Sequence, residues 1–155
     1  TWYYEFQELG FNYRLNEIQS ALGISQLSNL NKWVNYRNKL ANIYRKELKD
    51  LPIYIPDSRK DYYSSYHLFV ILIKKNKKKL SRENIYDLLK KNNIQSNVHY
   101  IPIHSHPFYK KLGFKNEKFP TMNKYYSECL SLPMYAGLTI KKQKKIISVL
   151  KKNLL

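Results

Sequence analysis

Cysteine is almost absent from this chain of 155 residues, which contains only Cys129. A single cysteine excludes an internal disulfide and fits a reducing cytosol, where such a residue is usually a small buried hydrophobe. The sequence also lacks a run of roughly 18 apolar residues, which a membrane span needs, and a basic leader followed by an apolar segment. We therefore expect a soluble, cytoplasmic protein. Because the first residue is not methionine, we also expect the chain to be cut at its beginning.

Motifs for phosphate loops and metal-assisted hydrolysis are absent as well. There are four glycines in all, and no Walker loop, GxGxxG or HExxH occurs. Three of the four histidines lie close together, at His99, His104 and His106, but no paired cysteines or nearby carboxylate pair complete a zinc site. No lysine falls in an apolar strand, where desolvation could lower its pKa for Schiff-base chemistry. These residues predict a binding protein with no metal and no obvious reacting centre.

Acidic residues are few, with 11 Asp and Glu against 28 Lys and Arg, and the formal net charge is +17. Such an excess is typical of proteins that bind polyanions, so a basic nucleic-acid-binding module is one interpretation. The excess is mostly lysine accompanied by many Asn, Ile and Tyr, as an A/T-rich genome produces, and the lysine clusters are spread along the chain. We keep nucleic-acid binding as the alternative, and expect the lysine run at 74–79 to be a solvated loop.

Hydrophobic residues make up 43% of the chain, which is enough for the core of one domain. Apolar residues at helical spacing continue from Asn16 to Asp50, and Pro52 forbids continuation. A single helix of that length would span roughly 50 Å, which is long for a small domain, so we expect a break near 28–31.

A strand–helix–strand unit is predicted next. Residues 65–73 read as a buried strand in which His67 is a core histidine rather than a base. Ser81 is the expected N-cap of a helix over 82–92, and 94–98 is the expected returning strand. The remaining predicted elements are a short helix over 120–129, a strand over 130–134 and a last helix from about residue 140.

Two groups of polar residues are candidates for ligand binding. The first precedes the long helix, where Asn16 and Gln19 form an approximate capping box. Asn12, Tyr13 and Arg14 there offer an amide, a phenol and a guanidinium beside helix N–H groups that already favour an anion. Phosphate is the ligand to expect at this entrance. The alternative is a capped helix with a surface arginine.

The second group lies in the segment 99–109, which is too rich in proline and imidazole rings to be an ordinary strand. His99, Tyr100 and His104 offer ring nitrogens and a hydroxyl that could bind sugar hydroxyls or a diphosphate. The prolines of the segment would hold these groups in place.

Four segments in a fixed order carry a resemblance to a known family. They are 10–15 (GFNYRL) with 19–23 (QSALG), 65–69 (SYHLF), 99–104 (HYIPIH) and 130–139 (LSLPMYAGLT). Together they resemble consecutive signatures of the pyridoxal-phosphate sugar aminotransferases of the DegT/DnrJ/EryC1/StrS family. The opening residues 2–9 are most similar to the branch of that family that acts in pseudaminic acid biosynthesis.

The resemblance implies an α/β chain that forms the C-terminal part of the fold-type-I PLP aminotransferase architecture. Residues 1–30 would end the large PLP-binding domain, 31–51 would form a linking helix, and 52–155 would form a small α+β C-terminal domain. A homodimer with active sites at the subunit interface is implied, and pyridoxal 5'-phosphate is the implied cofactor.

The resemblance also implies roles for individual residues. Asn12 would reach the cofactor phosphate across the dimer, and Arg14 would line the same site. The implied substrate is a nucleotide-sugar, a 4-keto-6-deoxy UDP-sugar that receives an amino group, with glutamate as the expected donor. The residues expected to face this substrate are Tyr13, His99, Tyr100 and His104.

The catalytic lysine of the family has no counterpart in this sequence. In the family pattern, the Schiff-base lysine and the aspartate that pairs with the pyridine nitrogen lie upstream of the position of Asn12. Since the chain offers no residues there to hold them, we expect that it does not transaminate alone. The missing half would be encoded elsewhere or lost by truncation, and an inactive remnant that pairs with an intact homologue is the other alternative.

Overall fold

The computed structural model describes residues 2–57, 61–74, 77–114 and 118–155. Helices and strands both occur, which confirms the predicted α/β class. The chain forms two compact units, one up to Lys32 and the other from Trp33 to Leu155. Of the predicted lysine loop at 74–79, residues 75–76 lie outside the described residues, and 77–79 are exposed.

The first unit begins with irregular chain over residues 2–16 and continues into helix α1 (Glu17–Leu48). The predicted capping box is confirmed. The Oδ1 atom of Asn16 accepts from the backbone N–H of Gln19 at 2.8 Å, and the backbone N–H of Asn16 donates to Oε1 of Gln19 at 3.1 Å. These two hydrogen bonds satisfy donors that the start of a helix leaves without partners.

Large apolar side chains of the first unit are exposed. They are Trp2, Tyr3, Tyr4, Phe6, Leu9, Phe11, Tyr13, Leu15, Ile18, Leu22, Ile24, Leu27 and Leu30. Soluble monomers rarely expose so many large apolar side chains in one segment, and such a surface commonly marks an interface.

The predicted break near 28–31 is wrong, because α1 is one helix of 32 residues. The polar residues in that region do not interrupt it, since their side chains bond back to the helix. Ser28 Oγ donates to the Ser25 carbonyl at 2.8 Å, and Asn29 Nδ2 donates to the same carbonyl at 3.2 Å. Such back-bonding is compatible with a continuous helix.

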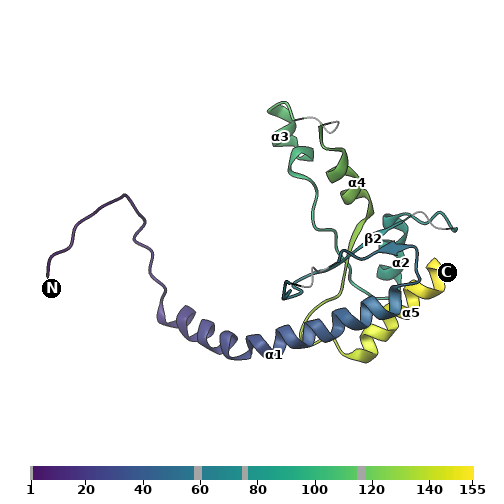
Figure 1. Ribbon diagram of the computed structural model, residues 1–155. Coiled ribbons are helices and arrows are strands. Elements are labelled where there is room, and N and C mark those ends of the chain that lie inside the picture. The colour runs from purple at the N-terminus through teal and green to yellow at the C-terminus, as the bar shows by residue number, and fades with distance from the viewer. Residues whose placement is uncertain (1, 58–60, 75–76, 115–117) are drawn as a thin grey trace. The chain divides into compact units, whose positions relative to one another are not determined.

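A three-stranded antiparallel sheet lies at the centre of the second unit (Figure 1). Its order is β1 (Ile53–Tyr54), β2 (Phe69–Ile73), β3 (Cys129–Leu132), and the β2–β3 register pairs Phe69 with Leu132 and Ile71 with Leu130. The predicted strand over 65–73 is therefore too long. Tyr66 has a φ of 42°, outside the strand region, so pairing begins only at Phe69.

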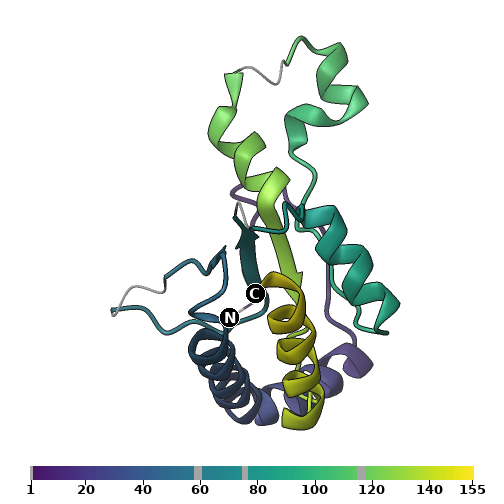
Figure 2. The same ribbon diagram turned by 90° about the vertical axis from the view of Figure 1, so that its right-hand side faces the viewer.

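The core of this unit lies between the sheet, the C-terminal half of α1 and α5 (Ile140–Leu154). Figure 2 shows α5 beside the C-terminal half of α1. The Tyr44 ring stacks on Phe69 with centroids 4.9 Å apart. Other buried members are Leu40, Ala41, Leu48, Ile71, Ile73, Ile85, Leu89, Leu130, Leu132, Ile146, Ile147, Leu150 and Leu154. Burial of each large side chain contributes about 1.5–3 kcal/mol. The predicted last helix is confirmed.

Helix α2 (Arg82–Lys91) has the predicted N-cap, because Ser81 Oγ accepts from the backbone N–H of Asn84. The predicted returning strand over 94–98 is wrong, and only Asn97 forms a bridge, with Ser131. The neighbouring N–H groups are used elsewhere: that of Ile94 donates to the Leu89 carbonyl, and that of Val98 donates to Oδ1 of Asn97.

The chain between Val98 and β3 leaves the sheet, and three short helices are found among its described residues, 99–114 and 118–128 (Figure 1). They are η1 (Ile103–Ser105), α3 (Pro107–Lys111) and α4 (Pro120–Glu128). The prediction that 99–109 is not an ordinary strand is confirmed, and so is the short helix that Pro120 begins. Strand β3 starts one residue earlier than predicted, at Cys129, and that cysteine is buried as expected.

Candidate functional site

Two histidines from separate segments line one small cavity in the second unit. His67 precedes β2, and His99 follows α2; with Ser131 of β3 they border a cavity of about 200 Å³. The remaining lining residues are Leu68, Gln95, Ser96, Asn97, Leu132, Pro133 and Met134. The cavity thus forms where three chain segments meet at the edge of the sheet.

The imidazole of His99 is held from both ring nitrogens. Its Nδ1 lies 2.8 Å from Ser131 Oγ, and its Nε2 lies 3.4 Å from Nδ2 of Asn97. The orientation of the Asn97 amide follows from its other contact, because its Oδ1 accepts from the Val98 N–H at 2.8 Å. An amide nitrogen can only donate, so Nε2 accepts and Nδ1 carries the proton that is donated to Ser131.

His67 was expected to be a core histidine, and this prediction is wrong. Its side chain is exposed, and it lies two residues before β2 instead of inside a strand. The apolar residues that follow it form the strand, and the positive φ of Tyr66 keeps His67 out of the pairing. His67 is therefore a site candidate that sequence reasoning missed. Its position directly before an apolar run was the available signal.

Tyr100 and His104 have different surroundings. Tyr100 is 68% exposed, and its ring meets that of His99 edge to face with centroids 4.6 Å apart. His104 is buried: its Nε2 lies 2.9 Å from Oδ1 of Asn123, and its ring stacks on Phe119 at 4.3 Å. His104 does not border the cavity beside His99. Its predicted contact with substrate stays a prediction.

The predicted phosphate-binding residues all lie in the first unit. Asn12 and Arg14 are exposed, in the chain just before the capped start of α1. Arg14 Nη1 donates to the Tyr13 carbonyl at 3.2 Å, and the Tyr13 ring stacks on Phe11 at 5.1 Å. A guanidinium has five N–H donors in all, so most of its donors stay available for an anion.

The cysteine is not a nucleophile in this setting. Cys129 is 1% exposed, and its Sγ donates to the Tyr126 carbonyl at 3.7 Å. Burial raises the pKa of the Cys129 thiol above 9.0, outweighing the opposite effect of Arg82. Because the thiolate is the reactive form, a raised pKa leaves the sulfur inert.

Neither a metal cluster nor a membrane helix is found in the part of the chain that the structure describes. No three or more His, Cys, Asp or Glu side chains in it gather so that they could hold a metal ion. None of its helices is both long and apolar enough to cross a membrane. The cavity beside His99 offers imidazole, hydroxyl and amide groups with no lysine among its lining residues, so it can bind a hydroxylated ligand and has no amine nucleophile.

Comparisons with known proteins agree on one family. The DegT/DnrJ/EryC1/StrS aminotransferase family matches residues 1–151. The UDP-4-amino-4,6-dideoxy-N-acetyl-beta-L-altrosamine transaminase of Helicobacter pylori is 37% identical over 150 residues, which are 95% of this chain and 39% of that protein. The chain spans about two fifths of the length of the curated relatives that it matches.

Solved structures give the same result. Helicobacter pylori PseC, an aminotransferase involved in the biosynthesis of pseudoaminic acid, matches with a TM-score of 0.80 and 34% identity, over 97% of this chain and 40% of that chain. The PLP form of a sugar aminotransferase from Streptococcus pneumoniae shares the fold, with a TM-score of 0.83 and 24% identity. The match covers 100% of this chain and 41% of that chain. The predicted fold-type assignment is confirmed.

The cofactor that these comparisons indicate is pyridoxal phosphate. The exposed amide of Asn12 and guanidinium of Arg14, beside the start of a long helix, form a donor set that fits its phosphate group. The match over residues 1–151, together with the shared fold, shows that the chain belongs to the DegT/DnrJ/EryC1/StrS aminotransferase family.

Proposed function

We propose that this chain is the C-terminal part of a nucleotide-sugar aminotransferase. The complete protein transfers an amino group from glutamate to a 4-keto-6-deoxy UDP-sugar, in the biosynthesis of pseudaminic acid. The observation that supports this most strongly is 37% identity to the Helicobacter pylori altrosamine transaminase over 95% of the chain.

The division of labour in the proposal follows the predicted domains. Residues 1–30 form the end of the large PLP-binding domain, residues 31–51 form the helix that links the two domains, and residues 52–155 form the small domain. The exposed apolar side chains between Trp2 and Leu30 support a partner in this region, because that much apolar surface is normally covered. The partner is the N-terminal half of the protein and, in a homodimer, a second copy.

Each candidate residue has a binding task in the proposal. Asn12 and Arg14 donate to the cofactor phosphate, which fixes the cofactor's position. When bound, pyridoxal phosphate withdraws electrons from the carbon that loses or gains the amino group. Hydrogen bonds with Asn97 and Ser131 fix the ring plane of His99, so that this ring presents a constant surface to the sugar.

The chain contributes binding residues and no catalytic lysine. The lysine that joins the cofactor covalently and moves the proton lies in the N-terminal half, according to the family pattern. Loss of that lysine removes the reaction itself and not only some affinity. We therefore expect no amino transfer from the isolated chain.

A chimera tests the proposal. This chain replaces the matched part of the Helicobacter pylori altrosamine transaminase, and release of 2-oxoglutarate from glutamate is measured with a UDP-4-keto-sugar and pyridoxal phosphate. The chimera should release more than one equivalent of 2-oxoglutarate per cofactor only when the sugar is present, because the sugar must accept the amino group before a second glutamate can react. The isolated chain, at the same concentration, should release none.

Two results would overturn the proposal. One is amino transfer by the isolated chain, which would show that the chain holds its own reacting amine. The other is a chimera that is folded by circular dichroism and binds the cofactor, yet does not act on the nucleotide-sugar. The matched control is the unaltered transaminase, which reports whether the assay detects the reaction.

A further inference from the structure

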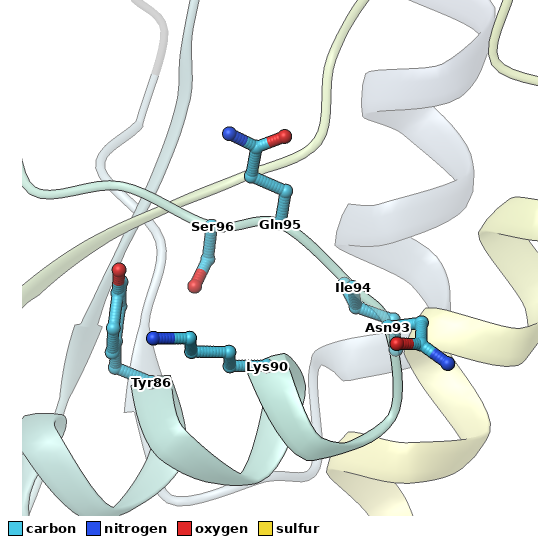
Figure 3. Close-up of a pocket in the computed structure, with 6 residues that line it drawn as sticks. All are labelled: Tyr86, Lys90, Asn93, Ile94, Gln95 and Ser96. Carbon is cyan, nitrogen blue, oxygen red and sulfur yellow. The ribbon is translucent and has the colours of Figure 1, made fainter.

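A second cavity, of about 390 Å³, lies beside the C-terminal half of α2 (Figure 3). Its lining residues are Tyr86, Lys90, Asn93, Ile94, Gln95 and Ser96. It shares only Gln95 and Ser96 with the cavity beside His99, so the two are neighbours with different walls.

The hydroxyl group of Ser96 is the notable feature of this cavity. The Ser96 residue is 8% exposed, and its Oγ has no hydrogen-bond partner among the described residues. Figure 3 shows the Ser96 side chain directed toward those of Tyr86 and Lys90. A buried hydroxyl without a partner is unfavourable, and a ligand oxygen placed in this cavity would remove that cost.

The three converging groups have the chemistry of an anion site. Lys90 supplies an ammonium group, Tyr86 and Ser96 supply hydroxyl donors, and none of the six lining residues is a carboxylate. Lys90 and Tyr86 are four residues apart on α2, which places their side chains on one face of the helix. Lysine binds phosphate as a point charge.

The nearby end of α2 would repel an anion if its last carbonyls were free, since a helix C-terminus carries partial negative charge. Those carbonyls are occupied. The Leu88, Leu89 and Lys90 oxygens accept from the backbone N–H groups of residues 92–94. The Asn92 carbonyl accepts from Lys145 Nζ at 2.9 Å, which brings a second cation to the same end.

The position of Ser96 is well determined by the fold. Asn93 has a φ of 57°, which ends α2 and turns the chain toward the sheet. Asn97 then bonds to Ser131 through both backbone groups, at 2.7 and 3.2 Å. Ser96 lies between these two anchors, so its hydroxyl is held close to the helix face that carries Lys90.

We propose that this cavity binds a phosphate group. Lys90 pairs with its charge, and the hydroxyls of Ser96 and Tyr86 donate to two of its oxygens. Its lining does not include Asn12 or Arg14, the residues that donate to the cofactor phosphate in the proposed function. The phosphate comes either from free inorganic phosphate or from a phosphate ester, which share this chemistry.

The test is a titration of the ¹⁵N-labelled 155-residue chain with inorganic phosphate and with glycerol phosphate, at constant ionic strength set with sodium chloride. Amide signals of Gln95 and Ser96 should shift and saturate with either probe. Tighter binding of glycerol phosphate would identify an ester as the source, and equal binding would identify free phosphate. Acetate in place of phosphate should bind more weakly.

Substitutions identify the binding groups. Lys90→Met should weaken phosphate binding at least about tenfold, since a hydrogen bond to a charged group has that effect. Ser96→Ala should weaken it several-fold. Lys91→Met is the matched control, because it removes the same charge from the same helix outside the cavity lining.

Three outcomes would overturn the proposal. The first is no saturable shift at Gln95 and Ser96 with either phosphate probe. The second is equal loss of binding in Lys90→Met and Lys91→Met, which would indicate nonspecific attraction to a basic chain. The third is acetate binding as tightly as phosphate. The circular dichroism spectrum of each variant shows whether it is folded, and Lys90→Met keeps the test decisive if Ser96→Ala does not fold.

Discussion

The Nδ1 atom of His99 lies 2.8 Å from the Oγ atom of Ser131, although the two residues are 32 positions apart. This contact ties the segment after α2 to strand β3, beside the backbone bridge between Asn97 and Ser131. Ser131 is 5% exposed, so its hydroxyl is shielded from competing water. The pairing fixes the position of the His99 ring, and the Asn97 amide fixes which ring nitrogen carries the proton.

Substitution of Ser131 by Ala should release the His99 ring. The Nδ1 proton loses its acceptor, so the balance between the two tautomers shifts, and the free energy of unfolding falls by about 1 kcal/mol. Long-range ¹⁵N–¹H spectra of the His99 ring measure the tautomers, and urea unfolding measures stability. Ser127→Ala is the control, because Ser127 is exposed and its hydroxyl donates to the nearby Lys124 carbonyl. Unchanged ring signals in Ser131→Ala would contradict this assignment.

Substitution of Asn12 or Arg14 by Ala should weaken cofactor binding in the chimeric aminotransferase. Each removes a donor to the phosphate, and a hydrogen bond to a charged group corresponds to about a tenfold change in the dissociation constant. Titration followed by cofactor absorbance measures this constant. Gln7→Ala is the control from the same segment. If the variants bind the cofactor as the parent does, these residues do not hold its phosphate.

Substitution of Tyr44 by Phe should change how stability depends on alkaline pH. The Tyr44 hydroxyl donates to the Pro133 carbonyl at 3.1 Å. Burial, and to a lesser degree the charge of Tyr135, raises the pKa of Tyr44 well above 10.0. Above pH 10.0 the unfolded chain therefore loses a proton that the folded chain keeps, and stability falls as pH rises.

The expected result for Tyr44→Phe has two parts. Near neutral pH the variant is about 1 kcal/mol less stable, because the Pro133 carbonyl loses its donor. Above pH 10.0 its stability declines less steeply than that of the parent chain. Urea unfolding on both sides of that pH measures the difference, with Tyr4→Phe as an exposed control. Parallel pH profiles of Tyr44→Phe and the parent would rule out this role.

Substitution of Lys151 by Met should destabilise the chain at neutral pH and have less effect in acid. Lys151 Nζ donates to Oε2 of Glu47 at 2.6 Å, and this hydrogen bond, with the charge of Lys151, lowers the pKa of Glu47 below 4.5. The stabilisation is present above pH 4.5 and is lost as the pH falls through the lowered pKa in the folded chain.

The measurement is the urea midpoint of Lys151→Met and of the parent chain at neutral pH and below pH 4.5. The difference should shrink in acid and also in high salt, because both side chains are partly exposed and the pair is screened. Lys152→Met is the matched control, with the same charge change one position later. A difference that persists in acid would show that Lys151 acts through packing alone.

Local hydrogen-bond signals were the most reliable part of the sequence. The Asn16–Gln19 box and the Ser81 N-cap could be predicted from residue type, because a cap uses partners within one helical turn. Apolar spacing likewise predicted the long first helix, α2 and α5, and it placed β2 and β3 within a few residues, but it did not predict β1, η1 or α3. The family motifs supplied the fold type, which spacing alone could not.

Contacts between residues far apart in the chain could not be predicted from the sequence, and neither could the hydrogen-bond partners of individual side chains. The continuity of α1 depends on where Ser28 and Asn29 send their side chains, and the predicted strand over 94–98 fails because its N–H groups have other acceptors. The exposure of His67 depends on the backbone turn at Tyr66. The bond between His99 and Ser131 requires a sheet edge that only the folded chain creates.

The buried amide of Gln143 joins α5 to α1. Its Nε2 donates to the Leu40 carbonyl at 2.7 Å, and the residue is 0% exposed. A slide of one turn would move α5 by about 5.4 Å along α1. Such a slide would leave the buried Gln143 amide without this acceptor, so the hydrogen bond, together with the Lys151–Glu47 pair, favours one register of the two helices. That register decides the depth at which the last helix supports the sheet.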